Sequence, residues 1–214
     1  MTKFTLGSGF GTLVRRHRGP LLAGLAIAVV ATVLGWLYVD DRYPSWYEEV
    51  RLSDGRVITI HQRHEVFDNY GTNQSWVEID LPELGGKRVW HSYLIPQRVD
   101  VHLGKVYVFG MPRGDRQYQH YQYPRSFLVA FIWTGSEFVR TPFLGVPEAL
   151  RQEENVYSCI PENRRTVLTT KQKNDSWCPP KGDDKQFTKQ INLPAFQALA
   201  IRYSRRSGGL PLTE

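Results

Sequence analysis

The sequence predicts a mainly β fold, an antiparallel β-sandwich or partly open barrel, preceded by a single N-terminal transmembrane helix and followed by a short C-terminal helix. Three observations predict this class. An uncharged apolar run occupies residues 20–39, short β-branched and aromatic segments separated by turn residues follow it, and helical periodicity is scarce before residue 194. Removing the first 39 of the 214 residues leaves 175, which is enough for one hydrophobic core.

Residues 20–39 are expected to cross a lipid bilayer as one helix. None of these 20 residues is charged, and 16 are apolar. At a rise of about 1.5 Å per residue they match a hydrocarbon core about 30 Å thick. Trp36 and Tyr38 lie at the far end of the run, where aromatic rings favour the membrane interface. The lipid bilayer is therefore an expected partner through residues 20–39.

The charges that flank this run predict its orientation. Three arginines and no acid lie within residues 15–18, whereas Asp40 and Asp41 follow the run. The positive-inside rule then places residues 1–19 in the cytoplasm, as a basic tail, and the C-terminal domain on the other side. The run is longer than the apolar region of a cleaved signal peptide, which favours an uncleaved signal anchor.

The basic charge of the chain belongs mostly to its N-terminal part. The net charge is +6, of which residues 1–39 carry +4. The rest of the chain is close to neutral. We therefore expect no nucleic-acid partner, because binding to phosphates requires concentrated positive charge.

The two cysteines, Cys159 and Cys178, both lie in the part expected to be exported. They are predicted to form one disulfide bond in an oxidising compartment. A redox couple is less favoured because the Cys-x-x-Cys spacing is absent.

The folded domain is expected over residues 46–206, after a linker at residues 40–45. Its first hairpin is predicted between Trp46 and Ile60, because Asp54-Gly55 suits the positive φ angles of a type I′ turn. That turn predicts two sets of side chains on opposite faces: Val50 and Leu52 with Val57 and Thr59, and Glu49 and Arg51 with Ile58 and Ile60.

The remaining elements are predicted in order along the chain. Strands are expected at residues 76–81 and 87–95, followed by hairpins at 99–109 and 126–141 that turn at Leu103-Gly104-Lys105 and Thr134-Gly135-Ser136. A short helical turn is expected within residues 147–152, a helix over residues 194–203 with Pro at its first position, and a loose tail at residues 207–214. Hairpins without long helices between them favour an antiparallel sandwich or partly open barrel over a parallel sheet.

Three segments carry a resemblance: Trp46-Tyr47-Glu48-Glu49-Val50 with Leu52-Ser53-Asp54-Gly55-Arg56, Leu103 to Gly110, and Trp133 to Pro142. Their order resembles a group of uncharacterised proteobacterial envelope proteins that open with a Trp-x-Glu-Glu-Val strand and an Asp-Gly-Arg turn. The resemblance covers Trp46 to Pro147 and does not include the two cysteines. It implies a bacterial inner membrane and a periplasmic domain, and it implies no activity.

No catalytic residue, metal site or cofactor is predicted. His61, His64 and Glu65 form the densest metal-like cluster, but a separation of three residues on a strand places the two histidines on opposite faces. The acid pairs are interpreted as solvated charge rather than as glycosidase carboxylates; they are Glu48-Glu49, Glu153-Glu154 and Asp183-Asp184. A hydrolase that uses histidines gathered by the fold is the least favoured hypothesis, and enzymatic activity is not expected.

The segment at residues 116–125 has the most unusual composition, with three tyrosines among Gln, His and Arg. Tyrosine offers a large amphipathic contact area, and Arg and Gln can hydrogen-bond a glycan or a partner chain. The candidate binding residues are Tyr118, His120, Tyr121, Tyr123, Arg125 and, from another segment, Trp76. The alternative is a surface loop packed on its own rings.

The leading hypothesis for function is a membrane-anchored periplasmic interaction module whose partner is an envelope protein or peptidoglycan. The alternative is a periplasmic ligand-binding or glycan-binding receptor. That receptor would have a concave site lined by Tyr118, Tyr121 and Trp76.

Overall fold

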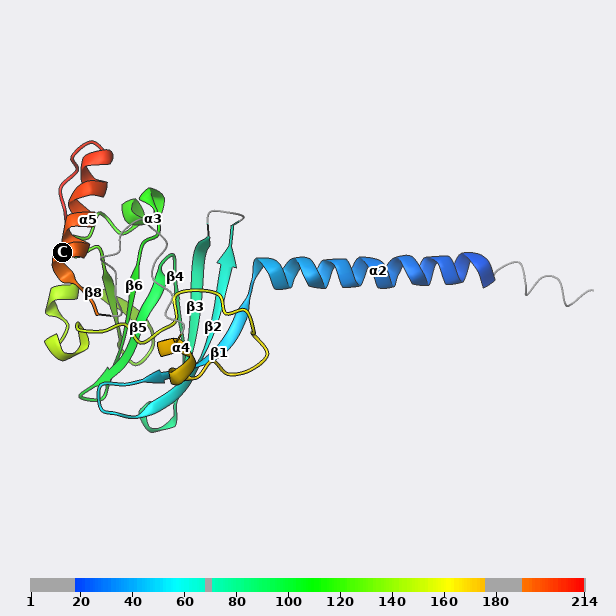
Figure 1. Ribbon diagram of the computed structural model, residues 1–214, viewed down its shortest axis with the longest axis horizontal. Coiled ribbons are helices and arrows are strands. Elements are labelled where there is room, and N and C mark those ends of the chain that lie inside the picture. The colour runs from blue at the N-terminus through cyan, green and yellow to red at the C-terminus, as the bar shows by residue number, and fades with distance from the viewer. Residues whose placement is uncertain (1–17, 68–70, 176–189, 214) are drawn as a thin grey trace, which may run out of the picture. The chain divides into compact units, whose positions relative to one another are not determined.

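The computed structural model describes residues 18–67, 71–175 and 190–213 (Figure 1). The chain divides into two compact units between Asp41 and Arg42. The helix α2 (Arg18–Arg42) is long and apolar enough to cross a membrane, in agreement with the predicted span. Only Tyr43 and Pro44 separate it from the first strand, so the connection is shorter than the predicted linker.

Residues 42–214 contain two four-stranded antiparallel sheets (Figure 1), which confirms the predicted mainly β class. The first sheet contains β1 (Ser45–Arg51), β2 (Val57–Val66), β3 (Thr72–Leu81) and β4 (Gly86–Ser92). The second contains β5 (Ile95–His102), β6 (Lys105–Met111), β7 (Val129–Trp133) and β8 (Phe138–Thr141). Strands pair in chain order within each sheet, so both sheets are meanders built from hairpins.

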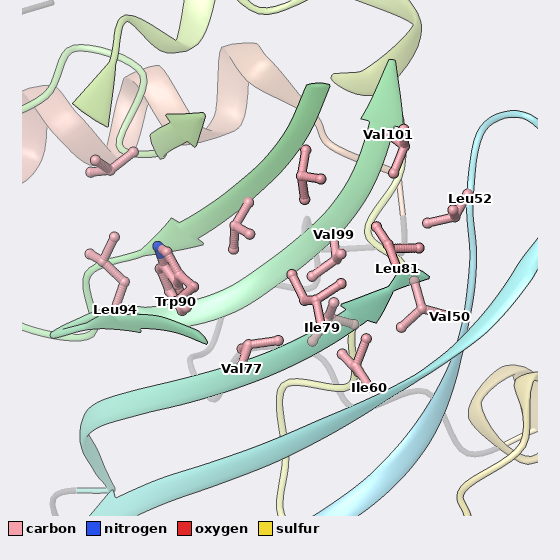
Figure 2. Packing of buried hydrophobic residues seen from close by; sticks show 14 of the residues in the cluster. Val50, Leu52, Ile60, Val77, Ile79, Leu81, Trp90, Leu94, Val99 and Val101 are labelled. Carbon is pink, nitrogen blue, oxygen red and sulfur yellow. The ribbon is translucent and has the colours of Figure 1, made fainter. Parts of the chain in front are cut away.

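The two sheets share one apolar core, which makes the arrangement a sandwich. Figure 2 shows Val77 and Ile79 of β3 and Trp90 of β4 together with Val99 and Val101 of β5. These side chains are at most 7% exposed. Burial of apolar surface contributes roughly 25 cal/mol per Å², so this contact between the sheets is a major source of stability.

A second apolar cluster covers the other face of the second sheet. The helix α5 (Leu193–Arg206) buries Phe196 and Ala200 in the same cluster as Phe109 of β6, and Asn192 caps the helix by accepting the N–H of Ala195 at 3.2 Å. The spacing of apolar residues at 194–203 predicted this helix. The shorter helices are η2 (Pro82–Leu84), α3 (Asp115–His120), η3 (Phe143–Gly145), η4 (Glu148–Leu150) and α4 (Thr170–Asp175).

The first hairpin is shifted by one residue from the predicted register. Val50 pairs with Ile58 and Glu48 pairs with Ile60. The N–H of Leu52 donates to the carbonyl of Arg56 at 2.8 Å, and this bond closes a three-residue turn with Gly55 at φ +89°. A one-residue shift exchanges the two faces of a strand, so Ile60 lies in the core and Val57 is exposed.

The outer edge of β1 is occupied by a later segment of the chain. The N–H of Glu49 donates to the carbonyl of Leu168, and the N–H of Leu168 donates to the carbonyl of Tyr47, both at 2.9 Å. Leu168 thus forms a parallel bridge with Glu48. The carbonyl of Tyr47 and the N–H of Glu49 at this edge are therefore satisfied within the molecule.

Gly110 of β6 allows a close approach between neighbouring segments. A Cβ atom at this position would lie 2.7 Å from the Cβ of Leu94 and 3.1 Å from the carbonyl oxygen of Ile95. We expect Gly110→Ala to lower the free energy of unfolding by about 1–3 kcal/mol, because backbone must move to relieve the overlap. Urea denaturation of the full chain in detergent measures this. At Gly145 the nearest atom would be 3.9 Å away, so Gly145→Ala is the control, and equal losses from the two variants would contradict the explanation.

Candidate functional site

The first sheet has one face outside the sandwich core. Strand register aligns Arg63 on β2, Trp76 on β3 and His91 on β4 in one row across this face. The guanidinium carbon of Arg63 lies 4.3 Å from the Trp76 ring centroid, and the His91 ring stacks on Trp76 at 4.8 Å and 5°. Because β3 lies between β2 and β4, the two neighbours cover opposite faces of the indole ring.

The row continues through aromatic neighbours on both sides. The Tyr93 ring centroid lies 6.3 Å from that of His91 and 4.9 Å from that of His120 on α3, while Tyr43 lies 6.4 Å from Trp76. Tyr93 is 40% exposed, and Arg63, His91 and His120 are also exposed. We call the set the aromatic band; its members are Tyr43, Arg63, Trp76, His91, Tyr93 and His120.

Gln74 and Glu65 form a hydrogen-bonded pair that holds His91 of the band in place. Gln74 donates to Glu65 at 2.7 Å, and its carbonyl oxygen Oε1 lies 2.8 Å from His91 Nε2. An amide oxygen only accepts, so His91 donates from Nε2 and keeps Nδ1 as an acceptor. Partial burial and the charge of Arg63 hold the pKa of His91 below its usual value. His91 is therefore a neutral acceptor at pH 7.

Arg63 supplies the positive charge of the band. Within the described part of the chain it has no carboxylate partner, and its contact is the cation–π interaction with Trp76. The indole ring holds the guanidinium in place while its N–H donors remain open to an external acceptor.

The structure places the predicted binding residues in different environments. Trp76 and His120 belong to the aromatic band, and Arg125 is exposed. The three tyrosines are buried, with exposed fractions of 0% for Tyr118, 8% for Tyr121 and 9% for Tyr123. The expected concave site lined by Tyr118, Tyr121 and Trp76 is therefore wrong, because two of its three rings belong to apolar clusters.

The burial of the tyrosines follows from local folding of the predicted loop. Residues 115–120 form α3, and the Tyr118 ring packs in the cluster under α5, where its hydroxyl lies 3.2 Å from the carbonyl oxygens of Pro124 and Ala200. Tyr121 is buried and contacts two members of the band, Tyr93 and His120. Its hydroxyl oxygen accepts the N–H of Tyr93 at 3.2 Å and bonds Ser92 at 2.5 Å.

The two neighbouring histidines of β2 point to opposite faces, as predicted. His61 stacks on Tyr47 with ring centroids 4.5 Å apart, whereas His64 is fully buried beside Trp46. Burial lowers the pKa of His64 to about 3, so it is neutral. No group of three potential metal ligands is found among residues 18–67, 71–175 and 190–213.

The interpretation of the acid pairs as solvated charge is wrong for two residues. Glu48 is 0% exposed and Glu154 is 1% exposed. The burial of Glu48 was predictable from the sequence, because Glu48 alternates with Trp46 and Val50 and so shares the inward face of β1 with them. Cys178 and Asp183-Asp184 lie outside the described residues, so the disulfide with Cys159 stays a prediction.

Sequence reasoning missed four members of the band: Tyr43, Arg63, His91 and Tyr93. Arg63 on β2 and His91 on β4 meet Trp76 only through the register of three strands, which the sequence does not state. No family model, curated protein or solved structure matches this chain.

Proposed function

We propose that this protein is a membrane-anchored periplasmic interaction module that binds an envelope protein through the aromatic band. The observation that carries the proposal is the row of Arg63, Trp76 and His91 on a sheet face that the core does not use, in which Arg63 and His91 are exposed and Trp76 is half-buried. Trp, Tyr and Arg are the residue types that contribute most to binding at protein interfaces. The apolar helix α2 supports the anchor, and the charges beside it support the periplasmic orientation.

The environment of Trp76 favours a protein partner over a glycan. A sugar ring binds an aromatic side chain by lying on its face, but Arg63 and His91 occupy both faces of the indole. A protein partner can instead use the ring edges, the open donors of Arg63 and the exposed ring of Tyr93. Peptidoglycan is the alternative partner, and the experiment below distinguishes the two.

Alanine substitutions in the aromatic band are expected to weaken binding of the partner protein without unfolding the domain. A photo-crosslinking amino acid at Tyr93 of the full chain, in its native membranes, should capture one envelope protein. With that protein purified, Arg63→Ala and Trp76→Ala should each weaken its binding by about 10- to 100-fold, the range of interface hot spots. Thr59→Ala, on the same face of β2 but outside the band, is the matched control and should bind normally.

Two results would count against this proposal. One is crosslinking that is equally strong in the Arg63, Trp76 and Thr59 variants, which would place the contact elsewhere. The other is co-sedimentation of the chain with purified peptidoglycan that the Trp76 variant abolishes, with no protein captured. That second outcome would establish peptidoglycan as the partner.

We further propose that Cys159 and Cys178 form a disulfide in the oxidising periplasm. Closing a loop of this length stabilises a fold by roughly 3 kcal/mol in the chain-entropy model. Mass spectrometry of a non-reduced digest of membranes should show the two cysteine peptides linked. Separate peptides, alkylated without prior reduction, would contradict both the bond and the compartment.

A further inference from the structure

A cavity of about 510 Å³ lies between the start of β3 and α3, and its volume is typical of small-molecule sites. Residues 71–73 form one side of the wall and residues 113–117 form the other. Gln117 holds the two sides together, because its Nε2 donates to the carbonyl of Asn73 at 2.8 Å and its Oε1 accepts the N–H of Arg113 at 2.6 Å. No member of the aromatic band is among the described residues of the wall, so the cavity is separate from the proposed recognition surface.

Arg113 is the group of the wall that points to a ligand. Its side chain is half-buried, and its guanidinium makes no hydrogen bond or ion pair with the described part of the chain. The guanidinium packs against Gly71, where a Cβ atom would lie 2.0 Å from its central carbon and 2.1 Å from one terminal nitrogen. Both residues line the cavity, so the glycine leaves room for the guanidinium in the wall. Its N–H donors are therefore available to an external acceptor.

The charge of the wall favours an anion. Arg113 and Arg116 are positive and Asp115 is negative, so the described residues of the wall carry one net positive charge. Asp115 and Arg116 are exposed, and water and salt screen their charges more than that of the half-buried Arg113. A planar guanidinium matches two oxygens of a phosphate or a carboxylate as a bidentate pair. An oxyanion is therefore the ligand chemistry that fits the cavity.

The place of the cavity in the chain indicates the source of this oxyanion. Phe67 also lines the cavity and is 48% exposed, and the guanidinium carbon of Arg42 lies 5.1 Å from its ring centroid. Glu65 holds Arg42 at this place by accepting from it at 2.9 Å. Arg42 follows the apolar run at residues 20–39 by three residues, and three residues span at most about 11 Å. Chain length alone therefore keeps this wall close to the headgroups of a bilayer that the run crosses.

We propose that the cavity binds the phosphate of a phospholipid from the membrane that α2 crosses, with the Arg113 guanidinium donating to two phosphate oxygens. The exposed ring of Phe67 contacts the glycerol and acyl carbons next to the phosphate, so a lipid gains an apolar contact that inorganic phosphate lacks. The proposal rests on the membrane anchor of the proposed function. It adds a second contact between the chain and the bilayer, made by the folded domain.

Calorimetric titration of the full chain in dodecyl maltoside tests this proposal. The probes are water-soluble dihexanoyl phosphatidylglycerol and inorganic phosphate at equal ionic strength, and protein-free micelles are the blank. The lipid should bind saturably, and inorganic phosphate should bind at least about tenfold more weakly because it cannot contact Phe67. Absence of saturable lipid binding would overturn the proposal. Equal affinity for the two probes would assign the cavity to a soluble phosphate and would overturn the lipid as its ligand.

Two variants separate this site from lipid that adheres to α2. Arg113→Gln removes the charge, whereas Gly71→Ala keeps the charge and places a Cβ atom where the guanidinium lies. Each should weaken lipid binding by about 10- to 100-fold while circular dichroism shows an unchanged fold. Arg165→Gln removes an exposed arginine outside the wall and should bind as the wild type does. Equal lipid binding by Arg113→Gln and the wild type would overturn the proposal.

Failure of this site and failure of the proposed function give different results. Arg63→Ala, in the aromatic band, should bind the lipid as the wild type does, and Arg113→Gln should still be crosslinked to the envelope protein through Tyr93. Loss of lipid binding in Arg63→Ala would overturn the assignment to this cavity. Extraction of membranes with alkaline carbonate tests the anchor alone. Release of the full chain by carbonate would contradict the anchor and, with it, the lipid as the source of the phosphate.

Discussion

The Glu154→Gln variant is expected to exceed the wild-type chain in stability at pH 8, and its advantage should shrink by about 4 kcal/mol on lowering the pH to 4. The unfolded carboxyl, with an ordinary pKa near 4.5, loses its proton as the pH rises, whereas the buried carboxyl keeps it up to about pH 8. Between these pH values the unfolded state binds fewer protons, so the stability of the wild type falls as the pH rises. Glutamine cannot ionise and removes this loss.

Urea denaturation at several pH values between 4 and 8 measures the effect. Glu153→Gln alters the neighbouring exposed carboxyl and should follow the wild-type profile. Parallel profiles for wild type and Glu154→Gln would show that the buried carboxyl ionises normally. Glu48, whose pKa burial also raises against the opposing effect of Lys173, adds to the wild-type loss at high pH in every variant.

Acid is expected to destabilise the domain through His64, by about 3 kcal/mol at pH 4. The ring is buried against Trp46, and its nitrogens lie 2.9 Å from Gln62 and 3.2 Å from Thr72, with no acid among these partners. The folded pKa of about 3 lies below the unfolded value near 6.5. The unfolded state therefore binds the extra proton first, and the stability present above pH 6.5 is lost as the pH falls toward 3.

His64→Gln keeps hydrogen-bonding groups but cannot take up this proton. Glutamine also leaves a packing defect, so the readout is how the difference from wild type changes with pH, and not its size at one pH. We expect the difference to decrease by about 3 kcal/mol between pH 7 and pH 4. His102→Gln, at a partly exposed position at the end of β5, is the control. A constant difference for His64→Gln would contradict the prediction.

The two buried groups together predict a plateau of maximal stability. Stability decreases above pH 4.5 because of Glu154 and below pH 6.5 because of His64. The full chain should therefore be most stable near pH 5–6.

Features set by neighbouring residues were predictable from the sequence. The length and lack of charge of residues 20–39 predicted α2, the Leu103-Gly104 turn predicted the β5–β6 hairpin, and the spacing of Phe196 and Ala200 predicted α5. Each of these depends on local backbone preference or on one periodicity. The register predicted for the first hairpin was wrong because Asp54-Gly55 fits both a two-residue and a three-residue turn. The choice between these turns depends on which face of the hairpin meets the second sheet.

The candidate site could be predicted only in part because its members meet through distant contacts. Trp76 and His120 were recognised by residue type, but Arg63 and His91 join Trp76 only once β2, β3 and β4 are aligned. Burial of Tyr118 depends on α5, some 80 positions later, whose residue Ala200 lies at its hydroxyl. Burial of Glu154 likewise depends on packing between distant segments, which local composition does not report.

The bridge between Leu168 and β1 matters for contacts between separate molecules. An unpaired strand edge can recruit the strand of a neighbouring molecule. Here the chain's own segment occupies the β1 edge before any neighbour arrives. The carbonyl of Tyr47 and the N–H of Glu49 are thereby not open to the strand of another molecule, so an intermolecular sheet cannot grow from this part of the edge without displacing Leu168.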